Sequence, residues 1–211
     1  MMINKTRILN EFIELVSVPC PSKDEKAEAD LLVQKLQAMG LEVKVDDAGR
    51  KIGGTTGNVW AFLPGNVEGT AGLFFEAHMD SVPPTTGTKV VRRDGVLYSD
   101  GTTTLGGDDK VGIAAVLEAV RAVQEQKIPH GDIQLCLRLP KRSVVWEWSI
   151  LIRRISGLIS VIAWISVVRP VSLRTLRRGC SIFILQSKVS RLMQVSSLKK
   201  VSMPLCWRRK L

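Results

Sequence analysis

Along residues 1–135, apolar positions recur first at helical and then at strand spacing, and the two patterns alternate. The predicted helices cover residues 1–18, 23–39 and 111–126, and the predicted strands cover 41–46, 58–63, 72–77 and the residues from 132 onward, with a hairpin at 90–98. Helices that alternate with strands are typical of the α/β class. The strand at 72–77 is mainly apolar, which predicts a central strand covered on both faces.

Ser22 stands just before the second predicted helix, after two prolines that end the first one. Glu25 follows three residues later, so the pair has the spacing of a capping box. We therefore predict that the Ser22 hydroxyl caps the helix that begins at Lys23. Gly40 is predicted to end this helix.

Two polar clusters stand where predicted elements meet loops. His78-Met79-Asp80 follows the apolar strand, and Asp108-Asp109-Lys110 follows a glycine-rich loop at 99–107. Imidazole and carboxylate groups are the usual ligands of Zn²⁺ and related ions, and in an H-x-D pattern on a strand both side chains point the same way. Helix capping and the helix dipole are an alternative explanation for an acidic pair at the start of a helix. A purely structural role is likewise the alternative explanation for a lone H-x-D pattern. The two clusters together favour a metal site.

The segments EAHMDSVPP and DGTTTLGGDDKVGIA resemble the M20 family of metallopeptidases, close to its peptidase T-like branch. The resemblance extends over residues 3–135. It implies the N-terminal part of a zinc-peptidase catalytic domain, with a central mixed sheet flanked by helices. It also implies that His78 is a metal ligand, that Asp80 has the catalytic role of supporting this ligand, and that Asp108 bridges two metal ions. Asp109 matches a position that is commonly acidic, and we assign it no ligand role.

The resemblance further implies an activity and its cofactors. A peptidase of this type hydrolyses a short peptide with water activated between two Zn²⁺ ions, and the same ligands accept Mn²⁺ or Co²⁺. An M20-type deacylase or amidohydrolase is the alternative enzyme. An intact relative is expected to form a homodimer. No signal-peptide pattern opens the sequence. We expect a cytoplasmic protein, and we expect no nucleic-acid or membrane partner.

Charge divides the 211-residue chain into two unlike parts. Residues 1–135 hold 14 Lys+Arg and 19 Asp+Glu, a net charge of −5, whereas residues 136–211 hold 16 Lys+Arg and one acid, a net charge of +15. The pI of about 9.8 therefore comes from the second part. Such a tail can be a basic binding segment, an unusual second domain, or the product of a wrong reading frame.

Codon logic favours the wrong reading frame. When the third base of each codon is read with the first two bases of the next, residues 139–143 permit A-E-E-V, residues 161–165 permit Y-C-L-D with the Asp forced, and residues 190–195 permit A-A-H-A-G. An M20 peptidase has an A-E-E motif, a further Asp and a late His in this order. None of these motifs is present after residue 135 in the chain as written. We infer a one-nucleotide slip near or just before Cys136.

The sequence thus predicts a partial M20 catalytic domain at 1–135 and an aberrant basic tail at 136–211. Lys141 and Arg142 stand where the family has its two Glu, so we expect the chain itself to be inactive. The alternative is a non-catalytic remnant whose tail binds acidic partners or membrane surfaces. We expect the tail to be poorly ordered or helical. Its uncharged stretch at 155–168 is too short for a transmembrane helix, which needs about 20 residues.

Overall fold

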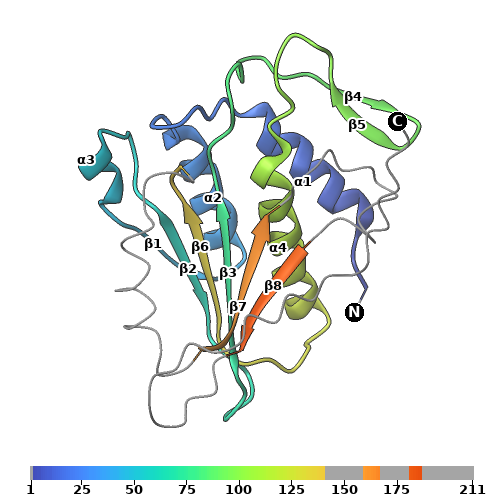
Figure 1. Ribbon diagram of the computed structural model, residues 1–211. Coiled ribbons are helices and arrows are strands. Elements are labelled where there is room, and N and C mark those ends of the chain that lie inside the picture. Colours follow the sequence, from blue (N-terminus) through green and yellow to red (C-terminus); the bar gives the residue numbers. More distant parts are fainter. Residues whose placement is uncertain (1, 141–158, 167–180, 187–211) are drawn as a thin grey trace, which may run out of the picture.

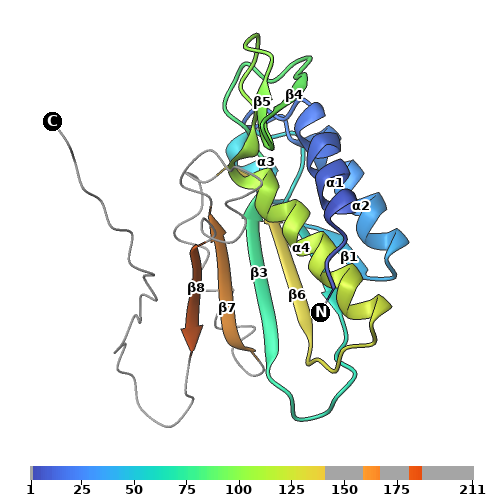
Figure 2. The same ribbon diagram turned by 90° about the vertical axis from the view of Figure 1, so that its right-hand side faces the viewer.

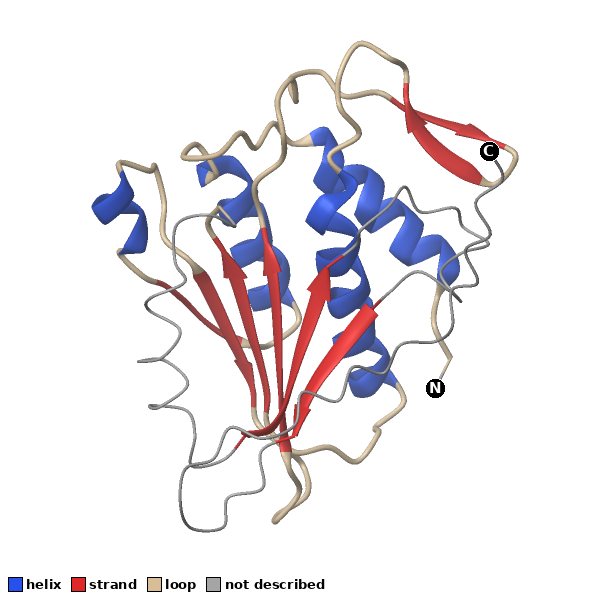
Figure 3. Ribbon diagram, viewed as in Figure 1, coloured by secondary structure: helices blue, strands red, loops and turns tan. Residues whose placement is uncertain are grey.

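The computed structural model describes residues 2–140, 159–166 and 181–186 and shows an α/β fold (Figures 1 and 3). A mixed six-stranded sheet forms its centre, in the order β1-β2-β6-β3-β7-β8. The predicted fold class is confirmed. The helices are α1 (Lys5–Ser17), α2 (Lys26–Ala38), α3 (Ala48–Ile52) and α4 (Gly107–Glu125).

Strand β3 (Gly72–His78) occupies the central position predicted from its apolar sequence. It pairs in parallel with β6 (Ile133–Arg138) on one side and with β7 (Ile159–Ser166) on the other. The flanking pairs are antiparallel. Strand β2 (Val59–Leu63) lies between β6 and β1 (Glu42–Val45), and β8 (Ser181–Gln186) pairs with β7. Strands β4 (Val90–Arg93) and β5 (Val96–Ser99) form the predicted separate hairpin, with positive φ at Asp94 and Gly95.

Helices α1, α2 and α4 lie on the same face of the sheet (Figure 2). The apolar side of each helix packs into one core with the side chains of β2, β3 and β6 that face it. Leu15, Leu32, Leu36, Leu117 and Leu135 are at most 1% exposed in this core. The core therefore fixes the ends of α1, α2 and α4 relative to the central strand.

Two local features differ from the prediction. Helix α2 begins at Lys26 rather than Lys23, and Ser22 makes no capping hydrogen bond to it. Residues 47–57, which lie between the predicted strands 41–46 and 58–63, contain the short helix α3, which Gly53 ends with a φ of 69°. Gly40 follows α2 with a φ of 76°, a conformation that glycine adopts without a steric penalty, so that prediction was correct.

The tail also differs from the prediction. Residues 159–166 and 181–186 are not helical; they are strands β7 and β8, which extend the sheet beyond β3. The positions of the expected acidic pair, Lys141 and Arg142, and the segment 190–195 lie outside the described residues. Within the described part of the chain, no helix is long and apolar enough to cross a membrane.

Candidate metal centre

The two predicted polar clusters meet at one end of the sheet. His78 is the last residue of β3, and Asp108 and Asp109 stand at the start of α4. The carboxyl end of β3 and the first turn of α4 lie at the same edge of the sheet (Figure 1). Ligands of open α/β sheets bind at this edge, beyond the carboxyl ends of the strands.

The imidazole of His78 is held between two aspartates. Its Nδ1 lies 3.2 Å from the carbonyl oxygen of Asp80, to which it donates, and 3.0 Å from the Asp80 carboxylate Oδ1. Its Nε2 is buried and makes no hydrogen bond to any described residue, and it lies 3.5 Å from Oδ1 of Asp108. Since Nδ1 carries the proton that Asp80 binds, Nε2 presents its lone pair toward Asp108.

Asp80 receives a second contact from a distant part of the chain. The hydroxyl of Ser22 donates a hydrogen bond of 2.6 Å to its Oδ2. The sequence pattern had assigned this hydroxyl to a helix cap, and the structure assigns it to the carboxylate beside His78. No signal within the sequence could have revealed the contact, because the two residues are 58 positions apart.

The charges of this cluster shift the pKa values of its members. Burial lowers the pKa of His78, but the contact with the Asp80 carboxylate and the charges of Asp80, Asp109 and Asp108 outweigh it, so the pKa is raised. Burial raises the pKa of Asp80, but the hydrogen bonds from His78 and Ser22 outweigh it, so the pKa is lowered. Asp80 is therefore ionised at neutral pH and attracts the Nδ1 proton of His78.

The start of α4 has an irregular backbone that exposes one aspartate and buries the other. Asp108 and Asp109 have non-helical φ and ψ angles, and the peptide bond between them is cis. The Asp108 side chain is 52% exposed, whereas Asp109 is 2% exposed. Gly106 precedes them with a φ of 67°, and a Cβ there would lie 3.0 Å from the Ser81 hydroxyl oxygen. Glycine thus allows this loop to approach the end of β3 closely.

A buried ion pair anchors the first turn of α4. Lys110 is 1% exposed, and its Nζ lies 2.8 Å from Oε2 of Glu28 in α2 and donates to the carbonyl oxygen of Leu15 in α1 at 2.8 Å. Burial raises the pKa of Glu28 to about 7, although the charge and hydrogen bond of Lys110 lower it. Sequence reasoning gave neither residue a role, although a lysine beside a predicted metal site was visible.

The donors present fit a metal ion in part. The separation of 3.5 Å between Nε2 of His78 and Oδ1 of Asp108 is close to the roughly 3.4 Å expected between two ligands of one tetrahedral zinc. A buried ring nitrogen without a hydrogen bond, aimed at a carboxylate, is the arrangement that a bound cation would complete. Among the described residues, no group of three or more His, Cys, Asp or Glu is placed to hold an ion. His78 and Asp108 thus supply two donors of a site that needs others.

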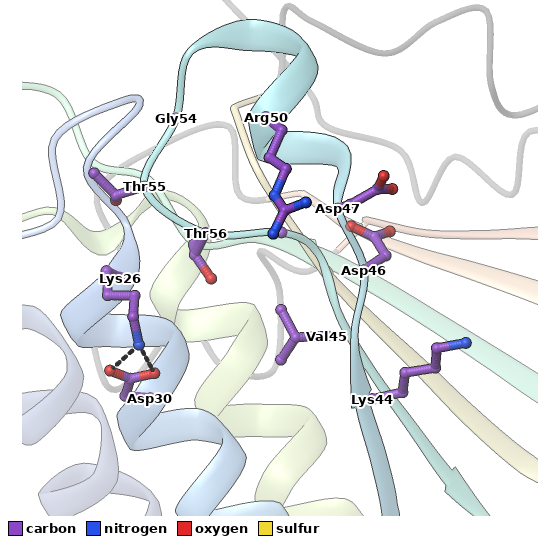
Figure 4. A pocket seen from close by; sticks show the side chains of 11 residues that line it. Lys26, Asp30, Lys44, Val45, Asp46, Asp47, Arg50, Gly54, Thr55 and Thr56 are labelled. Atoms are coloured by element: carbon purple, nitrogen blue, oxygen red, sulfur yellow. Dashed lines mark hydrogen bonds and ion pairs between the residues drawn. The ribbon is translucent and has the colours of Figure 1, made fainter.

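A separate groove of about 660 Å³ lies between α2, β1 and α3 (Figure 4). Lys26 and Asp30 form an ion pair on one wall, and Arg50 extends from α3 on the other side (Figure 4). None of the predicted metal ligands lines this groove. Its lining carries charges of both signs and is separate from the cluster at the end of β3.

Comparison with known proteins relates the residues of both clusters to one protein family. The family model described as Peptidase family M20/M25/M40 matches residues 74–138, which include both polar clusters. Over these residues the chain is similar to peptidase family M20. It is also similar to the peptidase T-like branch, since Peptidase T of Geobacillus kaustophilus is 31% identical to it over 153 residues. That match covers 55% of this chain and 35% of the relative.

Other relatives agree with this similarity. The uncharacterized protein YqjE of Bacillus subtilis is 38% identical over 142 residues, which cover 67% of this chain and 38% of the relative. Among solved structures, aminopeptidase PepT from Bacillus cereus is 36% identical with a TM-score of 0.72, and the match covers 79% of this chain and 44% of that chain. A tripeptidase from Staphylococcus aureus is 39% identical with a TM-score of 0.63, covering 66% and 37%. The chain therefore spans less than half the length of these relatives.

Proposed function

We propose that the gene specifies a metal-dependent peptidase of the peptidase T type, which removes residues from short peptides, and that this chain itself is inactive. The observation that supports the metal dependence is the pairing of His78 Nε2 with Asp108 Oδ1, 3.5 Å apart at the carboxyl end of β3. The relatives named Peptidase T and tripeptidase support peptides as the substrates.

Each residue of the cluster would have a different role. His78 and Asp108 would hold metal, and Asp80 would hold the Nδ1 proton so that Nε2 is free to bind. Two Zn²⁺ ions are the proposed cofactors, with Mn²⁺ or Co²⁺ as substitutes. Bound there, they would polarise the scissile carbonyl and lower the pKa of water. We also propose a cytoplasmic protein that forms a homodimer in its intact form.

The proposed inactivity rests on the tail. The M20 pattern places its acidic pair, one Glu as general base and one as ligand, where this chain has Lys141 and Arg142. Ammonium and guanidinium groups beside a dinuclear site repel the cations instead of binding them. We propose that residues 136–211 are an out-of-frame product of an M20 gene and not a second functional domain.

Two measurements test this proposal together. The nucleotide sequence across the codons for Ile133 to Ser143 should show one base extra or missing. A protein made from the restored frame should hydrolyse a tripeptide in the presence of Zn²⁺ and lose this activity in the His78→Ala variant. The pure 211-residue chain should show no metal-dependent hydrolysis. Clear hydrolysis by that chain, or an inactive protein from the restored frame, would overturn the proposal.

A further inference from the structure

We infer that Ser22 is a positioning residue for the metal ligand His78 and acts through Asp80. The inference rests on the proposed function, because it takes His78 to be a ligand. The observation behind it is a chain of two contacts that joins the connection between α1 and α2 to the end of β3. Ser22 Oγ lies 2.6 Å from Asp80 Oδ2, and Asp80 Oδ1 lies 3.0 Å from His78 Nδ1.

The two oxygens of the Asp80 carboxylate are thus engaged by different partners. A carboxylate that meets only the imidazole can rotate about its terminal bond, because this torsion has a broad minimum. The Ser22 hydroxyl holds Oδ2 and so directs Oδ1 at Nδ1 of His78. The carboxylate then acts together with the carbonyl oxygen of Asp80, which lies 3.2 Å from Nδ1, to fix the orientation of the imidazole and the position of its proton. Partners that orient a ligand in this way raise metal affinity without touching the metal.

The backbone around Ser22 is fixed independently of its side chain. The amide of Ser81 donates to the carbonyl oxygen of Cys20 at 2.7 Å, and Pro21 forms a bridge with Ser81. The amide of Lys23 donates to Oε1 of Glu25 at 2.6 Å. The loop therefore remains attached to the end of β3 when the hydroxyl is removed. Ser22 is exposed, so a change to alanine leaves no cavity in the core.

A capping role for Ser22 would compete with this inference. In the structure Glu25 is the N-cap residue of α2, and the helix begins at Lys26 without a side-chain capping bond. The hydroxyl of Ser22 donates to Asp80 and takes no part in the helix. Loss of the hydroxyl should therefore change the imidazole and leave α2 intact.

The test is the tautomer of His78 in the metal-free 211-residue chain, read from long-range ¹⁵N–¹H spectra. The chain has two histidines, so a His130→Gln variant assigns the signals. At about pH 9, where an ordinary imidazole is neutral, the unmodified chain should show a protonated Nδ1 and a bare Nε2. Ser22→Ala should shift both signals toward a mixture of tautomers, and Ser22→Thr should restore them.

Ser17→Ala is the matched control, because the Ser17 hydroxyl also makes one exposed hydrogen bond, to the Ile13 carbonyl oxygen. It should leave the tautomer unchanged. Co²⁺ is the metal probe, and its dissociation constant should rise about 10-fold in Ser22→Ala and return in Ser22→Thr. A chain that binds no Co²⁺ would contradict metal binding by His78 and Asp108 in this chain, and the tautomer would still decide the role of Ser22. An unchanged tautomer in Ser22→Ala would overturn the inference.

Discussion

The end of β3 and the start of α4 each carry an acidic residue toward the same point, but they fix it in opposite ways. Asp80 is held by its own side chain, between the Ser22 hydroxyl and the His78 imidazole. Asp108 is 52% exposed and is held by its neighbours, since Asp109 and Lys110 beside it are buried. A potential ligand can thus be positioned by contacts that it makes itself or by the anchoring of adjacent residues.

Because the two aspartates are fixed in different ways, changes near each should affect different properties. Changes near Asp80 should affect the orientation of the His78 imidazole, and changes near Asp108 should affect the stability of the fold. Contacts at Asp80 are partly exposed, so their loss should alter the imidazole more than the fold. The anchor of Asp108 is the buried pair of Lys110 and Glu28, which joins α4 to α2, so its loss should alter the fold first. Variants in each cluster can test this separation.

The largest expected effect is on the buried anchor. Lys110→Met leaves the carboxylate of Glu28 without its cation in a site that is 0% exposed. Removal of one partner from a buried ion pair costs about 3–5 kcal/mol of the free energy of unfolding. Urea denaturation should therefore show a loss of this size. The double variant Lys110→Met/Glu28→Leu should recover most of it, and a double variant as unstable as Lys110→Met would contradict the ion-pair explanation.

The next effect concerns pH. The pKa of Glu28 is raised by burial from the ordinary value of 4.5 to about 7. The folded state therefore binds this proton more tightly than the unfolded state. The resulting stability is complete below about pH 4.5 and is lost as pH rises through about 7, by an amount on the order of 3 kcal/mol. The free energy of unfolding of the unmodified chain should fall over this interval.

Glu28→Gln should reduce this pH dependence without abolishing it. Glu76 in β3 has a pKa raised to about 7, because burial outweighs the charge and hydrogen bond of Arg138. Its contribution has the same sign and remains in the Glu28→Gln variant. Urea denaturation at closely spaced pH values measures both slopes. Equal slopes in the two proteins would show that Glu28 is not the titrating group.

A smaller effect is expected on metal affinity when Asp80 is changed. Asp80→Asn retains the size of the side chain but removes the charge that holds the Nδ1 proton of His78. Loss of such a supporting partner weakens metal binding by about 10–100-fold. Titration with Co²⁺ should show this change together with an unfolding free energy close to that of the unmodified chain. A destabilised Asp80→Asn protein with unchanged Co²⁺ affinity would contradict the proposal that the contacts at Asp80 orient the imidazole and do not stabilise the fold.

The smallest effect is expected at the surface of α2. Lys26 and Asp30 form an ion pair at 2.6 Å, with side chains 57% and 54% exposed. Exposed pairs of this kind contribute less than about 1 kcal/mol. Lys26→Met should therefore change the unfolding free energy by less than a third of the change in Lys110→Met, measured in the same buffer. A loss as large as that of Lys110→Met would show that burial does not determine the strength of the anchor.

Most of the fold before residue 140 could be predicted, because each element carries its own periodicity. The apolar sequence of β3 indicated a central strand, and the Asp94-Gly95 turn indicated the β4–β5 hairpin. The short helix α3 escaped prediction because its sequence, AGRKI, lies within a polar, glycine-rich segment. Strands β7 and β8 escaped because the tail carries little periodicity to indicate them.

The candidate site was predictable only for the residues with a motif. His78, Asp80 and Asp108 were found from their types and spacing, and the structure brings them together. Ser22 fitted a capping box equally well, and only the folded chain shows that its hydroxyl reaches Asp80. Glu28 looked like one of many charges on an amphipathic helix. Contacts that join distant segments leave no local pattern from which they could be predicted.

His78 and Asp108 are the two residues proposed as donors to one metal ion. Titration of the 211-residue chain with Co²⁺, followed by the visible absorption of the bound ion, measures this. We expect weak but saturable binding, with a spectrum that is lost in His78→Ala and in Asp108→Asn and retained in His130→Gln. Equal binding by the unmodified chain and by both ligand variants would contradict a metal centre at the end of β3.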